Sequence, residues 1–172
     1  GGISWASTIV DFGGAGDDGR SIIVDQLNKN GFSGAVLVNA GDKLPSSCDV
    51  IYASHVLEHV YDLPELMRQL VFSLSPKGLL IVDIPDAHGL LEYWRMPILD
   101  FNTKHINHFV LRNMLDLGYY HNLEAVHIHD YMMENAHAYQ IHFRKFSVAR
   151  ESMRHVTANV LHRIEELNKI KE

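Results

Sequence analysis

Short apolar runs alternate with segments of helical spacing over the first half of this chain, and the alternation limits the folds it can adopt. The strand-like runs are residues 8–12, 35–38, 49–53 and 79–84. Between them, residues 21–28 and 63–74 repeat apolar side chains at helical spacing. This pattern predicts an α/β domain with a mainly parallel sheet and helices on both faces.

The second half of the chain has a different pattern. Residues 124–129 and 139–146 alternate between apolar and polar side chains, which predicts a terminal antiparallel hairpin. Residues 147–172 place apolar side chains at helical spacing and predict one amphipathic helix. We therefore expect a single α/β domain over residues 1–146, followed by a helix that packs on it or on a partner subunit.

Two connections and a short helix complete the predicted fold. Residues 75–78 (Ser-Pro-Lys-Gly) predict a turn, and residues 110–117 predict a short helix that ends at Gly118. Residues 86–108 form a long connection rich in aromatic and histidine side chains, and connections of this length are often functional. Tyr93, Trp94 and Phe101 could form an apolar wall there, or could simply pack over the sheet edge.

Composition narrows the choice of partners and compartment. The 172 residues include 15 Lys and Arg against 21 Asp and Glu, for a formal charge of −6. An acidic surface repels phosphate backbones, so we expect no nucleic-acid partner. The most apolar stretch, residues 78–85, is too short to span a membrane, and because no basic-then-apolar pattern is evident we expect no signal peptide. The single cysteine, Cys48, fits a reducing cytoplasm.

The distinctive polar segments follow the ends of the predicted strands. They are residues 11–16, 39–42, 54–59 and 85–88. In open parallel sheets, ligands bind beyond the carboxyl ends of the strands. The sequence therefore predicts a ligand site built from these segments.

The glycine-rich segment after the first strand indicates the kind of ligand. Residues 14–19 match the dinucleotide pattern G-x-G-x-x-G, but Asp17 and Asp18 would repel a pyrophosphate by a few kcal/mol. Position 39 is Asn, where a dinucleotide site needs an acidic ribose ligand. A cationic cofactor without phosphate, such as S-adenosylmethionine, fits better, and Asp11 can anchor the loop or accept from its ammonium group. A tight turn that binds no ligand is the alternative.

Several motifs occur in one order along the chain and resemble the class I S-adenosylmethionine-dependent methyltransferase family. They are residues 9–16 (IVDFGGAG), 42–45, 48–60 (CDVIYASHVLEHV), 74–82, 84–86, 105–109 and 115–119. The resemblance covers about residues 7–146. It implies a Rossmann-like sheet that is mostly parallel with a C-terminal antiparallel hairpin.

The resemblance also implies which residues bind the cofactor. Those at the methionine end are Asp11, Gly13, Gly14, Ala15 and Gly16; those at the ribose, adenine and sulfonium are Asn39, Asp42, Leu44, Ser54 and His55.

The chain departs from the family pattern at three places. Ala15 replaces a usual glycine, and Asn39 replaces the usual acidic residue that binds the ribose hydroxyls. Residues 35–50 are too few for the usual strand, helix and strand, so we expect an abbreviated sheet. These departures motivate an alternative hypothesis, a non-catalytic module that has lost cofactor binding.

Twelve histidines invite metal and acid–base hypotheses. Residues 55–59 match the H-x-x-E-H pattern of inverted zinc proteases, but that pattern needs both histidines on one helix. Here the motif directly follows a strand, so we expect no metal site. His121, His127, His129, His137 and His142 lie around the terminal hairpin and are expected at solvated sheet positions.

Three other histidines are candidates for a role in catalysis. His105 and His108 lie in the long connection that should cover the cofactor's methyl group, and His59 closes the 55–59 motif. One of the three could take a proton from a hydroxyl acceptor or orient it. Ordinary loop histidines bonded to backbone carbonyls are the alternative.

The sequence therefore predicts transfer of a methyl group from S-adenosylmethionine to a small molecule. The family's small-molecule and glycan members suggest a hydroxyl of a sugar or related metabolite as the acceptor. A non-catalytic module and an NAD-dependent enzyme are the alternatives. A homodimer could form through the C-terminal helix.

Overall fold

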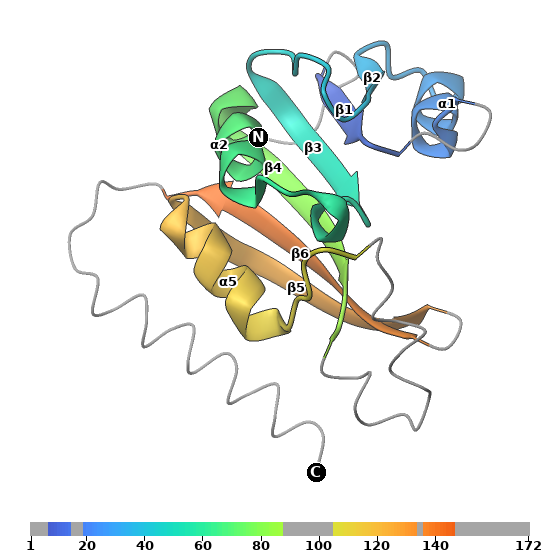
Figure 1. Cartoon of the computed structure of the whole chain (residues 1–172). Helices are drawn as coiled ribbons and strands as arrows, with labels where there is room; N and C mark the ends of the chain where they lie inside the picture. Colours follow the sequence, from blue (N-terminus) through green and yellow to red (C-terminus); the bar gives the residue numbers. More distant parts are fainter. Residues whose placement is uncertain (1–6, 15–18, 88–104, 134–135, 147–172) are drawn as a thin grey trace.

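The computed structural model describes residues 7–14, 19–87, 105–133 and 136–146. Its strands form one six-stranded sheet in the order β2-β1-β3-β4-β6-β5 (Figure 1). The strand bounds are β1 Ile9–Phe12, β2 Ala35–Val38, β3 Cys48–Ser54, β4 Leu74–Pro85, β5 Leu123–Met133 and β6 Ala136–Lys145.

The sheet has a parallel part and an antiparallel part. β2, β1, β3 and β4 run parallel to one another, and Asp11 of β1 lies level with Leu37 of β2 and Tyr52 of β3. β6 is antiparallel to both β4 and β5. The predicted fold class is confirmed. In the described residues β2 leads to β3 through residues 39–47 without a helix, which matches the expected abbreviation.

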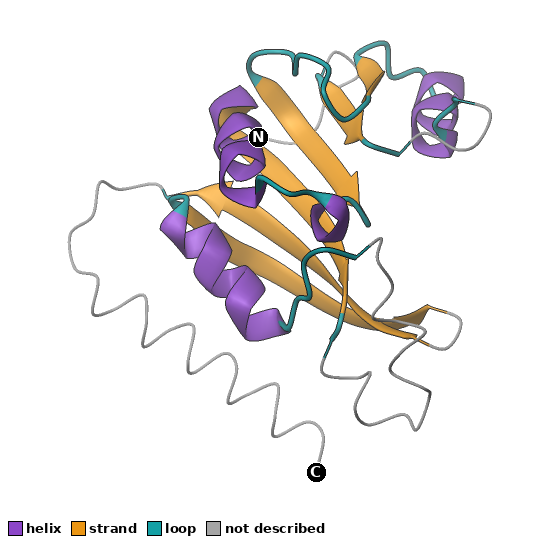
Figure 2. Cartoon of the chain, in the orientation of Figure 1, coloured by secondary structure: helices purple, strands orange, loops and turns teal. Residues whose placement is uncertain are grey.

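The helices pack round this sheet (Figure 2). They are α1 (Ile22–Lys29), α2 (Leu63–Ser73) and α5 (Leu111–Tyr120), together with a 3₁₀ helix, η1 (Leu57–His59). α1 packs beside β1 and β2, whereas α2 and α5 cover one face of β3, β4, β5 and β6. Each of two N-termini is capped, α1 by Ser21 and α2 by Asp62, whose side chains accept backbone N–H bonds.

The main core lies between the sheet and the pair α2 and α5. Leu80, Val82 and Ile84 alternate along β4 and are fully buried there. Met67 of α2 and Met114 of α5 are fully buried in the same cluster. Burial of such side chains contributes about 1.5–3 kcal/mol each, which fixes the helices on this face.

Two sequence predictions about element ends are wrong. α5 continues past Gly118 to Tyr120, because the helix packs its glycine against Phe143 and needs no stop there. Residues 75–78 lie within β4, where the pairing with β3 shifts register between Cys48 and Val50. The turn-forming residues therefore occupy an irregular segment of a strand.

Some predictions fall outside the described residues. They concern the helix over residues 147–172, the wall formed by Tyr93, Trp94 and Phe101, and the cofactor-binding roles of Ala15 and Gly16.

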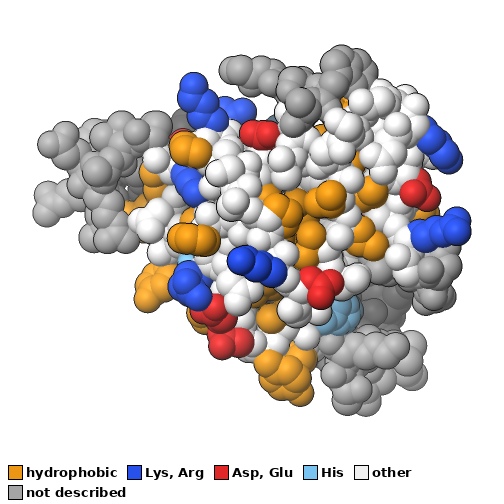
Figure 3. Space-filling model, turned by 90° about the horizontal axis from the view of Figure 1, so that it is seen from above, with side chains coloured by type: hydrophobic (Ala, Val, Ile, Leu, Met, Phe, Trp, Pro, Cys, Tyr) orange, Lys and Arg blue, Asp and Glu red, His pale blue; other side chains and the backbone are white. Residues whose placement is uncertain are grey.

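Two further observations concern the length of the helices and the charges on the surface. Within the described ranges, every helix is too short or too polar to cross a bilayer. On the face drawn in Figure 3, Lys and Arg side chains are interspersed with Asp and Glu, and hydrophobic side chains gather near the centre.

Candidate active site at the carboxyl edge of the sheet

Segments far apart in the sequence meet where the parallel strands end. The N–H of Gly13, just after β1, donates to the carbonyl of Val38 at the end of β2, at 2.8 Å. A Cβ on Gly13 would lie 2.8 Å from Cγ2 of Val56, just after β3. After β4, the N–H of Ala87 donates to the carbonyl of Phe109 at 2.7 Å. The strand ends therefore form one continuous edge, as the sequence predicted.

Asp11 anchors the first loop at this edge. Its side chain is buried, and Oδ2 accepts a bond from Oγ of Ser21 at 2.5 Å. Ser21 in turn caps α1 by accepting from the N–H of Val24 at 2.9 Å. Among the described residues, Oδ1 of Asp11 has no hydrogen-bond partner. Burial raises the pKa of Asp11, and the bond from Ser21 offsets part of that rise.

The two glycines after β1 are required by close packing. Gly13 has φ +73°, a conformation that favours glycine. A Cβ on Gly14 would lie 2.2 Å from Oδ2 of Asp11. The backbone of the loop therefore lies directly against the buried carboxylate, which places the loop and Asp11 together.

The connection after β2 carries three more of the predicted residues. Asn39 is exposed, and its carbonyl accepts the N–H of Asp42 at 3.0 Å in a turn. Asp42 and Leu44 line an open groove with Arg68 and Phe72 of α2. Leu44 is also part of the buried core, at 9% exposure. The structure thus places Asp42 and Leu44 against α2.

The connection after β3 begins with a strained histidine. His55 has φ +52°, which is uncommon for a residue other than glycine, and its N–H donates to the carbonyl of Asp83 at 3.1 Å. Its Nδ1 lies 3.1 Å from Oε1 of Glu58. That hydrogen bond, with the nearby charges of Glu58 and Asp83, raises the pKa of His55 despite partial burial. Ser54 and His55 therefore lie at the edge, as predicted.

Glu58 is the most deeply buried acid of this region. Its exposure is 0%, and Oε2 has no hydrogen-bond partner among the described residues. Its backbone carbonyl accepts the N–H groups of Ile106 at 2.7 Å and of Asn107 at 3.0 Å. The Asn107 side chain bonds the carbonyls of Leu57 at 2.9 Å and Val60 at 2.6 Å. These bonds fasten residues 105–107 onto η1.

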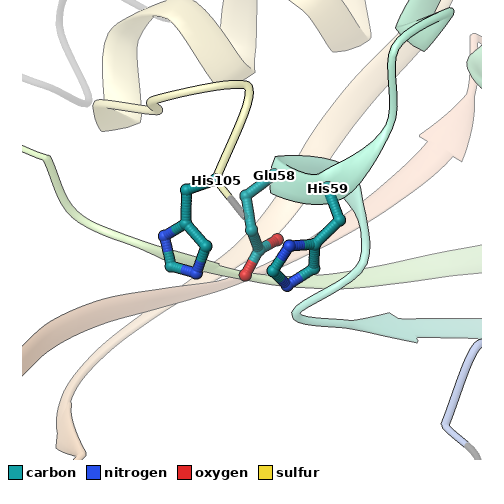
Figure 4. A group of neighbouring side chains, drawn as sticks. All are labelled: Glu58, His59 and His105. Carbon is teal, nitrogen blue, oxygen red and sulfur yellow. The ribbon is translucent and has the colours of Figure 1, made fainter. Parts of the chain in front are cut away.

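This fastening brings two of the three candidate histidines together. The rings of His59 and His105 lie 4.9 Å apart between centroids, in an edge-to-face arrangement. Figure 4 shows both rings on either side of the Glu58 carboxylate. Partial burial lowers the pKa of His105. His108 is exposed on the same segment.

The pattern H-x-x-E-H does not form a zinc-protease helix here. His55 is in the left-handed region, and only Leu57–His59 are helical. The sequence prediction that this motif lacks the helix of a zinc protease is therefore confirmed.

A second buried carboxylate lies next to the site on β4. Asp83 is 2% exposed, and its Oδ2 accepts a hydrogen bond from the hydroxyl of Tyr52 on β3. Burial and this bond raise the pKa of Tyr52 to about 12, so the phenol keeps its proton and remains the donor.

The prediction that His137 is a solvated sheet residue is wrong. Its side chain is 10% exposed, with Nδ1 3.1 Å from Oδ2 of Asp86 and Nε2 bonded to Oδ1 of Asp130. Pairing of β5 with β6 and of β6 with β4 brings the three residues together. His127 and His129 are exposed as predicted, His142 is half-buried on β6, and His121 lies at the C-cap of α5.

Sequence reasoning assigned no role to Glu58, Asp83, Asp86 or Asn107. The signals were weak but present: Asp83 interrupts an apolar run, and Glu58 stands inside a motif judged only as a zinc-protease pattern. Burial of Glu58 depends on residues 105–107, about 50 positions later. A local sequence pattern cannot predict a contact between residues so far apart in the chain.

A comparison with family models identifies the family of this chain. A model described as a methyltransferase domain matches residues 7–128. The chain belongs to the methyltransferase domain family. The match spans the Asp11–Gly14 loop, η1 and residues 105–109, so the segments that build the edge all lie within it. The predicted class I S-adenosylmethionine-dependent methyltransferase family is confirmed. A search of curated proteins found no match.

Solved structures with the same fold are distant in sequence. An S-adenosylmethionine-dependent methyltransferase from Mesorhizobium loti is 16% identical with a TM-score of 0.62, over 81% of this chain and 91% of that one. The O-methyltransferase NcsB1 from neocarzinostatin biosynthesis, solved with S-adenosylmethionine and 2-hydroxy-5-methyl naphthoic acid, is 17% identical with a TM-score of 0.55, over 84% and 51%.

The same fold occurs in a protein with another activity. A structure titled a pericyclic reaction enzyme is 12% identical with a TM-score of 0.56, over 82% of this chain and 43% of that one. The chain therefore spans less than half of that protein and about half of NcsB1. Likeness at these identities shows the fold, and the reaction must be argued from the site.

Proposed function

We propose that this methyltransferase-family chain transfers the methyl group of S-adenosylmethionine to a hydroxyl of a small molecule. The observation that carries the proposal is the edge itself. The Asp11–Gly14 loop lies at the end of β1, η1 follows β3, and residues 105–108 are hydrogen-bonded to η1. The Asp11–Gly14 loop suits the positively charged methionine end of the cofactor, and the histidine-bearing segments suit the acceptor's hydroxyl.

The residues of the first loop fit the cofactor's methionine end. Oδ1 of Asp11 is buried and lacks a hydrogen-bond partner in the described part of the chain, which is costly unless a ligand supplies one. An ammonium group would satisfy it and would favour the charged carboxylate. Gly13 and Gly14 let the loop backbone lie directly against Val56 and the Asp11 carboxylate, which holds the loop at the buried charge.

The histidine segments fit the acceptor. The cofactor supplies a methyl group on a positively charged sulfur, which is open to attack by an oxygen. The chain must hold that oxygen in line with the departing sulfur, and positioning can supply much of the rate. His59, His105 and His108 lie on two segments joined by the bonds of Asn107, so they can orient the hydroxyl or take its proton.

We propose a sugar or related metabolite as the acceptor. The chain's resemblance to small-molecule and glycan members of the family supports this class. NcsB1 is titled an O-methyltransferase and was solved with a hydroxylated naphthoic acid, which makes phenols the class to compare.

Calorimetric titration with S-adenosylhomocysteine tests cofactor binding first. We expect binding at micromolar to sub-millimolar ligand by the wild-type chain. Absence of heat at millimolar ligand would instead support the non-catalytic module, for which Asn39 at the ribose position is the specific observation. Turnover is then measured as S-adenosylhomocysteine formed with panels of sugars and phenols. Alanine replacement of His59, His105 and His108, one at a time, must lower it in at least one case.

A further inference from the structure

Glu58, His59 and His105 converge on one point at the candidate site. Each offers a ligand atom, either a carboxylate oxygen or a ring nitrogen, and these atoms all lie within 4.8 Å of one another. Figure 4 shows the two imidazoles flanking the carboxylate. The sequence predicted no metal site, because the zinc-protease motif of residues 55–59 directly follows a strand and lacks the helix that it needs. That motif does not include His105.

The spacing of these three atoms is close to that of a metal site. Zinc holds nitrogen and oxygen ligands at about 2.0–2.2 Å, so two ligands of a tetrahedral ion lie about 3.4 Å apart. Atoms within 4.8 Å of one another reach that separation by closing about 1.4 Å at most, which small side-chain rotations provide. Two histidines and one glutamate form a ligand set that zinc accepts, with a fourth position left open.

The surroundings of Glu58 already prepare its carboxylate for a cation. Oε1 interacts with Nδ1 of His55 at 3.1 Å, whereas Oε2 is buried and has no hydrogen-bond partner among the described residues. A buried carboxylate oxygen without a partner is costly, and a cation would satisfy it. His55 thus corresponds to the outer partner that orients ligands in metal sites.

The backbone fixes the third ligand relative to the first two. The N–H groups of Ile106 and Asn107 both donate to the carbonyl of Glu58, and the Asn107 side chain bonds the carbonyls of Leu57 and Val60. His105 immediately precedes these two hydrogen-bonded residues. Because His59 is exposed, an ion can reach the three groups from solvent.

We propose that Glu58, His59 and His105 bind one divalent cation of the zinc class, with an open position that receives the acceptor's hydroxyl. That the open position receives the acceptor's hydroxyl rests on the proposed function. As ligands of the cation, His59 and His105 orient the hydroxyl through it and do not take its proton; the bound hydroxyl loses its proton to solvent more readily beside the cation. Its oxygen then forms a bond to the methyl carbon, the carbon–sulfur bond breaks, and its electron pair stays on sulfur as a neutral thioether.

Zinc binding by the metal-stripped chain tests the site directly. We expect calorimetric titration with zinc chloride to show one tight site per chain. His105→Ala and the isosteric Glu58→Gln should each weaken that site by at least about 100-fold, because loss of even an outer partner costs 10–100-fold. His129→Ala and Glu65→Gln are the matched controls, since His129 is exposed on β5 and Glu65 lies half-exposed on α2, where it pairs with Arg68. They should keep the tight site.

The outcomes separate this inference from the proposed function. No tight site, or a tight site that survives His105→Ala, would overturn the metal inference. His105 is only partly buried, so this variant should fold, and a thermal melt verifies it. S-adenosylhomocysteine is titrated with and without a chelator in parallel. Cofactor binding without zinc binding defeats only the metal site, and zinc binding without cofactor binding defeats only the proposed function.

Discussion

Asp11 on β1 and Asp83 on β4 are each 2% exposed, and each has one oxygen bonded and one without a partner in the described residues. They differ in what bonds them. Asp11 accepts from the serine that caps α1, so it ties the first loop to the helix that follows. Asp83 accepts from Tyr52 on the adjacent strand, so it ties β3 to β4 at the level of the site. Removing the hydroxyl of Ser21 or of Tyr52 would leave a buried carboxylate with one hydrogen bond fewer, which is destabilising.

Tyr52→Phe should therefore destabilise the fold. The substitution keeps the ring and removes the hydroxyl that bonds Asp83, so we expect a loss of about 1–3 kcal/mol in the free energy of unfolding. Tyr61→Phe is the matched control because Tyr61 is 89% exposed, and it should change stability by less than about 0.5 kcal/mol. Urea unfolding at neutral pH measures both. Equal stabilities of the two variants would contradict the assigned role of the Tyr52 hydroxyl.

Asp11→Asn should separate stability from cofactor affinity. The variant keeps an oxygen that can accept from Ser21 but loses the negative charge. We expect S-adenosylhomocysteine to bind about 10- to 100-fold more weakly, because bonds to charged groups contribute about 1.5–3 kcal/mol. Asp25→Asn, at an exposed position on α1, should bind as the wild type does. Unchanged affinity in Asp11→Asn would remove Asp11 from the cofactor site.

The stability of the wild type relative to Asp11→Asn should depend on pH. Because burial raises the pKa of Asp11 in the folded chain, the folded state favours the protonated carboxyl. Its contribution to stability is fully present below the unfolded value of about 3.9 and is lost as pH rises through the folded pKa. Asn carries no such proton. Unfolding without ligand should therefore show wild type losing stability relative to Asp11→Asn as pH rises from about 4.

At the scale of elements, the sequence predicted strands and helices well and their ends less well. Runs such as residues 35–38 coincide with β2 because four apolar residues bounded by polar turns leave little choice. Gly118 was predicted to end a helix, but it lies inside α5 because close approach to Phe143 excludes any side chain. A glycine that ends a helix and one that admits a neighbour look alike in sequence, and only the packing of α5 on the sheet distinguishes them.

Gly118→Ala should destabilise the chain although alanine favours helices. Alanine gains about 1 kcal/mol over glycine in a helix interior. Its Cβ would lie 2.4 Å from Cε1 of Phe143, a ring that is fully buried, and overpacking costs about 1–3 kcal/mol. We expect a net loss of about 1 kcal/mol by urea unfolding.

A double-mutant cycle with Phe143→Leu checks the cause of that loss. The smaller side chain removes the ring that the new methyl meets, so Gly118→Ala should be neutral or stabilising in the Phe143→Leu background. The coupling between the two positions should then be about 1 kcal/mol or more. Additive effects would mean that the contact with Phe143 does not set the cost.

At the scale of the whole molecule, the sheet order explains what could be predicted about the site. Asp11 lies near the end of β1, and Gly13 and His55 directly follow β1 and β3, so a rule about parallel sheets locates all three at one edge from sequence. Glu58 and His105 are brought together by bonds between η1 and a segment about 50 residues later, which no local pattern encodes. Hence the position of the segments proposed to bind the cofactor could be predicted from sequence, and the three-residue cluster required the fold.

The same sheet order predicts how a ligand should act on the whole chain. A molecule bound across the ends of β1 and β3 contacts segments that unfolding separates, so it should stabilise the fold by about 2.7 kcal/mol at 100 times its dissociation constant. For a chain of this size that raises the melting temperature by about 5–10 °C. S-adenosylhomocysteine should produce this rise and NAD should not. Hydrogen exchange should slow at the N–H groups of Gly13 and His55, which bond across strand ends. Equal protection by NAD would favour a dinucleotide site instead, because a pyrophosphate would then be tolerated beside the acidic first loop.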